Sequence, residues 1–181
     1  MSRLGWLHFV LALIGLGAGL FVTIVRKGTA VHRRAGWIYA VSLLGVNLTA
    51  LLIYQLTGRF GPFHAAAIFS LLTLVAGVVP VRRREGRAWV RRHAYWMSGS
   101  YVGLVAAATA ESLTRIPSTP FWWTVVAASG AVAGTGALII GTRVRPAVAR
   151  FERRAAPSPR PPARRGHAEA IRSGSPSIGR R

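Results

Sequence analysis

The chain lacks cysteine and aspartate altogether, and its only acidic residues are four glutamates. Without cysteine there are no disulfides, no thiolate metal ligands and no nucleophilic thiol. Only 15% of the 181 residues are charged, whereas soluble domains carry about 25%. No segment resembles a nucleophile–base pair, a phosphate-binding loop or a dinucleotide fingerprint. The sequence therefore offers no candidate catalytic residues, and we do not expect an enzyme.

The few charges are almost all positive, with 24 Lys and Arg and a net charge of +20. A charge of this size indicates nucleic-acid binding when it coats a folded surface. Here the bases lie in short clusters between long uncharged runs. We therefore expect no nucleic-acid partner.

Long uncharged runs decide the class of protein. A helix of about 20 apolar residues crosses the roughly 30 Å hydrocarbon core of a bilayer, and each run is long enough. The first is too long for the apolar part of a cleaved signal peptide. We predict an all-α integral membrane bundle of five transmembrane helices in residues 1–142, at about 4–25, 33–56, 60–80, 91–113 and 120–141.

The basic residues between these runs predict the orientation. On the side of the N-terminus the loops hold Arg3, Arg59 and Arg115. The loops on the other side hold many more, namely Arg26, Lys27, Arg33, Arg34, Arg82, Arg83, Arg84, Arg87, Arg91 and Arg92. Because cytoplasmic loops are enriched in Lys and Arg, we expect the N-terminus outside and the C-terminus in the cytoplasm, in the cytoplasmic membrane.

Residues 143–181 differ from the rest in being rich in Pro, Arg and Ser. Such a composition predicts a disordered tail. On the cytoplasmic side its bases would interact with anionic lipid headgroups, at about 1 kcal/mol per base close to the surface. RNA binding by the tail is the less favoured alternative.

The histidines show an unusual regularity. His8 and His64 lie at the outer ends of the first and third helices, whereas His32 and His93 lie at the inner ends of the second and fourth. Histidine pairs on alternate helices of a bundle can provide the axial ligands of two haems, a scheme similar to that of b561-type cytochromes. The arginines beside His32 and His93 could receive haem propionates. Alternatively, each histidine is an interfacial or structural residue.

Glu111 is the one acidic residue inside a predicted span. It lies 18 residues, or five turns and roughly 27 Å, after His93, which places it at the outer end with His8 and His64. Arg115 follows at the i+4 position and predicts a salt bridge. A wider outer cluster of all four residues is the alternative, as is an outer metal site of His8, His64 and Glu111.

Two pairs of glycines have the spacing of close helix contacts in membranes. Gly15 and Gly19 share a helix face with His8, so we expect His8 to point into the bundle. Gly130 and Gly134 predict a second close contact, made by the fifth helix, although an oligomer contact is possible for such a motif.

Three segments resemble a family of bacterial predicted membrane proteins named for a domain of unknown function, number 2306. They are KGTAVHRRAGWIYA, GRFGPFHAAAIFSLLTLVAGVVP and RRHAYWMSGSYVGLVAAATAESLTRIP. The resemblance spans roughly Leu4 to Ile140 and implies a multi-pass inner-membrane protein. The family pattern matches here at His32, Arg33, Gly36, Tyr39, His64, His93, Met97, Ser100, Tyr101, Glu111, Arg115 and Pro117.

Two functions remain as hypotheses at this point. The paired histidines favour a haem-binding electron carrier, with His8, His64, His32 and His93 as ligands of haem b. The alternative is a non-enzymatic membrane protein, such as a small transporter or an assembly partner, in which these histidines have structural roles.

Overall fold

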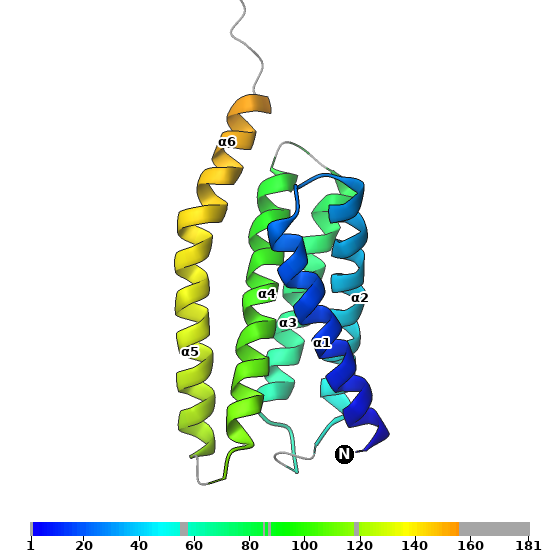
Figure 1. Ribbon diagram of the computed structural model, residues 1–181, viewed down its shortest axis with the longest axis vertical. Coiled ribbons are helices and arrows are strands. Elements are labelled where there is room, and N and C mark those ends of the chain that lie inside the picture. The colour runs from blue at the N-terminus through cyan, green and yellow to red at the C-terminus, as the bar shows by residue number, and fades with distance from the viewer. Residues whose placement is uncertain (1, 55–57, 85, 87, 118–119, 156–181) are drawn as a thin grey trace, which may run out of the picture.

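A computed structural model describes residues 2–54, 58–84, 86, 88–117 and 120–155, and the regular secondary structure in this part of the chain is helical (Figure 1). The elements are α1 (Arg3–Ile24), α2 (Ala30–Leu52), α3 (Pro62–Arg83), α4 (Trp89–Thr114), α5 (Phe121–Ile139), a π-helical turn η1 (Ile140–Val144) and α6 (Arg145–Ala155). The last three form one continuous helix.

Four of the described helices are long and apolar enough to cross a membrane. They are α1, α2, α3 and the continuous Phe121–Arg154 helix, with mean hydropathies between 1.6 and 2.2. Large apolar side chains on their outer faces, such as Phe69 and Trp123, are 67% and 76% exposed. In water such a surface would be unfavourable, whereas in lipid it is the expected one. The prediction of an all-helical membrane bundle is confirmed.

α4 does not belong to these four, because it contains more polar residues than the others. It nevertheless lies in the middle of the assembly, packed against α3 and α5 and more loosely against α1. Its Ser100 is buried among the other helices. Part of the lower hydropathy of α4 thus comes from a polar side chain, Ser100, that faces protein, while Arg91, Arg92 and Ser112 are exposed.

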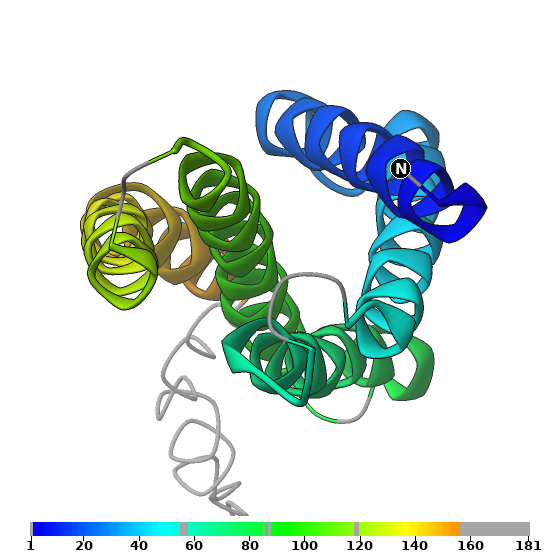
Figure 2. The same ribbon diagram turned by 90° about the horizontal axis from the view of Figure 1, so that it is seen from below.

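Helices α1 to α4 surround a common core, and α5 packs on the outside of α4 (Figure 2). α1 runs along α2, α2 packs against α3, and α3 runs along α4. The core consists mainly of Tyr39, Leu43, Leu74 and Leu104. In this order α2 and α4 are diagonal partners, and both begin at the same end of the bundle (Figure 1).

The two ends of the bundle differ in charge. One end carries the α1–α2 and α3–α4 connections and most of the bases; we call it the basic end. Its described members are Arg26, Lys27, Arg33, Arg34, Arg82, Arg83, Arg84, Arg91 and Arg92. The opposite end carries the N-terminus and the α2–α3 and α4–α5 connections, with Arg3, Arg59 and Arg115 (Figure 1).

Glycines in α1 permit a close approach of helices. A Cβ atom on Gly19 would lie 2.4 Å from the ring of Tyr101, and one on Gly15 would lie 3.3 Å from Leu104.

The contact predicted at Gly130 and Gly134 of α5 is not made within the described part of the chain, because a Cβ atom on either glycine would meet nothing within 4 Å. α5 instead approaches α4 at Gly136, where a Cβ atom would lie 2.4 Å from Val102. The contact of α5 with α4 thus lies at a different position from the one that the motif predicted.

The helix that begins with α5 continues into the segment expected to be disordered. The N–H of Arg145 bonds to the carbonyl of Ile140, five residues earlier. This widened turn directly precedes Pro146, which has no N–H to offer a normal helical turn. Further on, Glu152 forms an ion pair with Arg91 of α4 at 3.6 Å. The remainder of the predicted tail, including His167, lies outside the described residues.

Candidate functional site

A buried hydrogen bond joins the diagonal helices α2 and α4 in the centre of the bundle. Tyr39 Oη lies 2.9 Å from Ser100 Oγ, and the two residues are only 2% and 1% exposed. Ser100 donates its own proton to the carbonyl of Met97, so Tyr39 is the donor of the shared bond. Beside it, Tyr101 donates to the carbonyl of Leu16 at 3.2 Å and ties α4 to α1.

This bond fixes the register of two histidines nearer the basic end. His32 precedes Tyr39 by seven residues, and His93 precedes Ser100 by seven. Seven residues are about two helical turns, or about 10.5 Å, so each histidine lies on the same helix face as its polar partner. Because α2 and α4 run in the same direction, His32 and His93 lie at about the same depth.

The His93 ring is held by a backbone carbonyl. Its Nδ1 lies 2.9 Å from the oxygen of Gly77 on α3. Since a carbonyl can only accept, Nδ1 carries the proton and Nε2 keeps its lone pair. This tautomer, with Nδ1 bonded to a carbonyl, is the one usual in metal-binding histidines.

His32 is less constrained. Its backbone N–H donates to the N-cap side chain of Thr29 at 3.1 Å, while its Nδ1 is buried without a hydrogen-bond partner among the described residues. The nearby Lys27 donates to the carbonyls of Val22 and Thr23 at the end of α1, and burial lowers the pKa of Lys27. His32 and His93 thus lie at the same end of the bundle on diagonal helices.

At the opposite end, His8 connects three helices. Thr49 donates its proton within α2 to the carbonyl of Gly45, so its oxygen accepts from His8 Nδ1 at 2.8 Å. His8 Nε2 lies 3.7 Å from one carboxylate oxygen of Glu111. Arg115 binds the other carboxylate oxygen at 2.5 Å. The structure therefore brings together His8, Glu111 and Arg115, and adds Thr49.

His64 does not join this cluster through any described contact. It is 3% exposed, and its Nδ1 accepts a hydrogen bond from the Gly61 N–H at 3.2 Å. The ring packs against Tyr54 and Phe60, with centroid distances of 4.5 and 5.1 Å. His64 is the third residue of α3, and its ring satisfies the N–H of the N-cap residue Gly61, as the third residue does in a capping box.

Sequence reasoning missed the contact of His64, for which a local signal existed. Pro62 at the first position of α3 marks a helix start, which puts His64 at the capping position. The partners of His8 and His93, namely Thr49 and the carbonyl of Gly77, have no signature in the sequence.

The family comparison covers all five long helices. Residues 5–148 match the family described as Predicted membrane protein (DUF2306). The chain belongs to this family. A search of curated proteins and a search of solved structures each found no match. Membership in DUF2306 agrees with the multi-pass membrane bundle.

For this DUF2306 protein, an outer metal site of His8, His64 and Glu111 has no support. In the described part of the chain, no group of three His or Glu residues gathers in a way that could hold a metal ion. The haem hypothesis requires two pairs of histidines, His32 with His93 at the basic end and His8 with His64 at the opposite end.

Proposed function

We propose that the protein crosses the cytoplasmic membrane five times, with α4 as a fifth span. α4 has 26 residues, which is about 39 Å of helix, and it lies alongside the four apolar helices. The basic end faces the cytoplasm, because cytoplasmic loops collect Lys and Arg. α6 and the basic tail then lie beside anionic headgroups.

The absence of cysteine makes this topology simple to test. Single cysteines in place of Arg3 and Arg26 lie at the opposite and basic ends. In intact cells a membrane-impermeant thiol reagent is expected to label the first and not the second. The reverse labelling pattern would refute the orientation.

Within this framework we propose a haem-binding electron carrier with one haem b, held by His32 and His93. The Tyr39–Ser100 hydrogen bond carries the proposal, since it sets the two histidines at one depth on diagonal helices. His93 has the tautomer that leaves Nε2 free to bind iron. His32 Nδ1 and His64 Nε2 are both buried without a described partner, but His64 Nε2 carries the ring proton because His64 Nδ1 accepts from Gly61. Iron coordination by two imidazoles is a common arrangement in helical bundles.

The opposite-end pair does not fit a second haem. The Gly61 N–H on His64 Nδ1 puts the ring proton on Nε2, the atom that would have to bind iron. His8 Nε2 faces the Glu111 carboxylate. The proposal therefore departs from the two-haem arrangement expected from the sequence. The assignment of arginines to propionates also lacks support at Arg33, which bonds to the Gly28 carbonyl, and at Arg91, which pairs with Glu152.

A bound haem would supply one-electron redox chemistry. The residues of this chain then have three tasks. Gly77 orients the His93 ring through its carbonyl, the Tyr39–Ser100 bond fixes the spacing of the two helices, and the apolar core below excludes water from the ligands. Buried surroundings of this kind are among the means by which a protein sets a haem potential.

A reduced-minus-oxidised absorption spectrum tests the proposal on protein purified in mild detergent after expression with added haem precursor. We expect a haem b signal in the wild type and its loss in His32→Ala and in His93→Ala. His64→Gln is the matched control and is expected to keep the signal. A wild type without haem, or an unchanged signal in His93→Ala, would refute the proposal.

A second candidate, a small transporter, is favoured by one observation. Glu111 is an ionisable residue within a helix of the bundle, and it interacts with His8; such residues often mark ion or proton pathways. Proteoliposomes loaded with a pH-sensitive dye would show a proton flux that Glu111→Gln abolishes. Equal dye responses in protein-free vesicles would rule this candidate out.

A further inference from the structure

The arginines of the basic end divide into two groups. Most of those near α3 and α4 have a partner: Arg82 stacks over Trp37 at 4.9 Å, Arg84 stacks over Trp89 at 5.8 Å, and Arg91 pairs with Glu152. The side chains of two others near α3 and α4, Arg83 and Arg92, are exposed and have no hydrogen bond, ion pair or ring contact with the described residues. Both line the same cavity.

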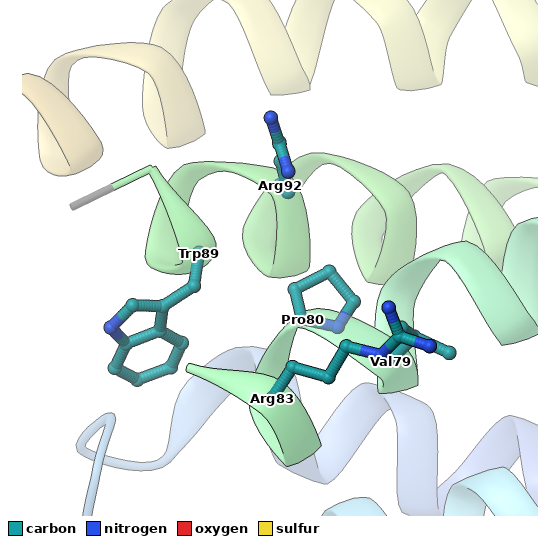
Figure 3. A pocket seen from close by; sticks show the side chains of 5 residues that line it. All are labelled: Val79, Pro80, Arg83, Trp89 and Arg92. Atoms are coloured by element: carbon teal, nitrogen blue, oxygen red, sulfur yellow. The ribbon is translucent and has the colours of Figure 1, made fainter. Parts of the chain in front are cut away.

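That cavity lies between the end of α3 and the start of α4 and has a volume of about 110 Å³. Figure 3 shows its five lining side chains: Val79, Pro80 and Arg83 come from α3, and Trp89 and Arg92 come from α4. The space is several times that needed by one water molecule. A group larger than a water molecule can therefore enter the cavity.

The depth of the cavity in the bundle indicates which anions are available. Tryptophan is enriched at the level of lipid headgroups, and Trp89 forms one wall of the cavity. Trp37 of α2, the ring under Arg82, is a second tryptophan near this end. The anions present at this level of a membrane are the phosphates of phospholipids.

We propose that this cavity is a binding site for a phosphate group, contributed by the headgroup of an anionic phospholipid. Arg83 and Arg92 supply the positive charge from two different helices. The guanidinium fork binds phosphate oxygens in pairs, which a lysine does not do. Val79, Pro80 and the Trp89 ring give the site an apolar wall on the side of the glycerol and acyl chains. Bound lipid would hold the ends of α3 and α4 together beside His93.

The site is independent of the basic tail. Arg83 and Arg92 belong to the bundle itself, and neither is in α6. A lipid preference that depends on them would therefore survive neutralisation of the tail. This separates the site from general attraction of a basic segment to an anionic surface.

Native mass spectrometry of the purified full-length protein with phosphatidylglycerol or phosphatidylcholine measures the preference directly. We expect the wild type to retain phosphatidylglycerol, and Arg83→Gln/Arg92→Gln to lose at least about tenfold in apparent affinity, because two charge-assisted contacts disappear. The control Arg150→Gln/Arg153→Gln, in α6, is expected to keep the wild-type preference. Arg83→Lys/Arg92→Lys keeps the charge without the fork and is expected to fall between the two.

Equal lipid binding by the wild type and the Arg83→Gln/Arg92→Gln variant would overturn the proposal, as would a loss of the preference in the α6 control. Inorganic phosphate is the second arm of the experiment. If millimolar phosphate displaces the lipid and protects Arg83 and Arg92 from arginine-specific modification in the absence of lipid, the site serves free phosphate and the lipid assignment is wrong. A thermal unfolding curve for each variant shows that the protein remains folded.

Discussion

Tyr39 on α2 donates a hydrogen bond to Ser100 on α4 across the centre of the bundle, at 2.9 Å. Both residues lie seven positions after a histidine, so this bond also sets His32 and His93 at about the same depth. A single buried contact thus connects packing in the core with the geometry of the candidate site at the basic end.

The strength of this bond can be measured with a double-mutant cycle of Tyr39→Phe and Ser100→Ala. In membrane proteins such pairs contribute about 0.6 kcal/mol on average, and up to about 1.7. We expect a coupling energy in this range from unfolding of the detergent-solubilised protein. Strictly additive effects of the two substitutions would show that the bond does not form.

The close approach of α1 predicts different effects at two neighbouring glycines. Gly19→Ala would place a Cβ atom 2.4 Å from the Tyr101 ring, whereas nothing lies within 4 Å of Gly17. Overpacking of this kind costs about 1–3 kcal/mol. We expect Gly19→Ala to lower the unfolding midpoint clearly and Gly17→Ala to leave it unchanged or raise it. Equal midpoints would contradict the packing of α1 described above.

The capping role of His64 predicts that glutamine is a better replacement than alanine. Glutamine at the third helical position can accept the Gly61 N–H as His64 does, whereas alanine leaves that donor without a side-chain partner. Loss of a capping contact costs about 1 kcal/mol. We expect His64→Ala to be less stable than His64→Gln in thermal unfolding. The reverse order would argue for a role in which the imidazole itself is needed.

Among the described residues, the Glu111 side chain has two partners and the Arg115 side chain has one, so their replacement has unequal effects. The Arg115 side chain is 53% exposed, and ion pairs of exposed groups contribute about 0–1 kcal/mol. Glu111→Gln disturbs the contact with His8 as well. We expect Glu111→Gln to be the more destabilising of the two. An effect of Arg115→Gln as large as that of Glu111→Gln would show that His8 contributes nothing.

Much of the fold could be predicted from the sequence, because the thickness of a bilayer dictates the length of the apolar runs. Helix ends were less predictable. α2 begins at Ala30 instead of about 33, since Thr29 caps it through the N–H of His32, and a His-Arg-Arg segment is easily taken for a loop. The helix from Arg145 to Ala155 was missed because its composition is that of a disordered tail.

The site was predictable only in part, for a physical reason. Helical periodicity places Tyr39 in phase with His32, and Ser100 in phase with His93, without any structure. It does not reveal how each helix is rotated about its axis. The contacts of His93 with Gly77 and of His8 with Thr49 depend on that rotation, and so does the separation of His64 from His8.

The most direct test of the central claim is a haem-to-protein ratio, determined by a pyridine haemochrome assay on the purified protein. The account predicts one haem b per chain, still present in His64→Gln and absent in His93→Ala. Two haems per chain would contradict the capping role of His64 and the ion pair of His8. A ratio of zero after expression with ample haem precursor would contradict the assignment of His32 and His93 as iron ligands.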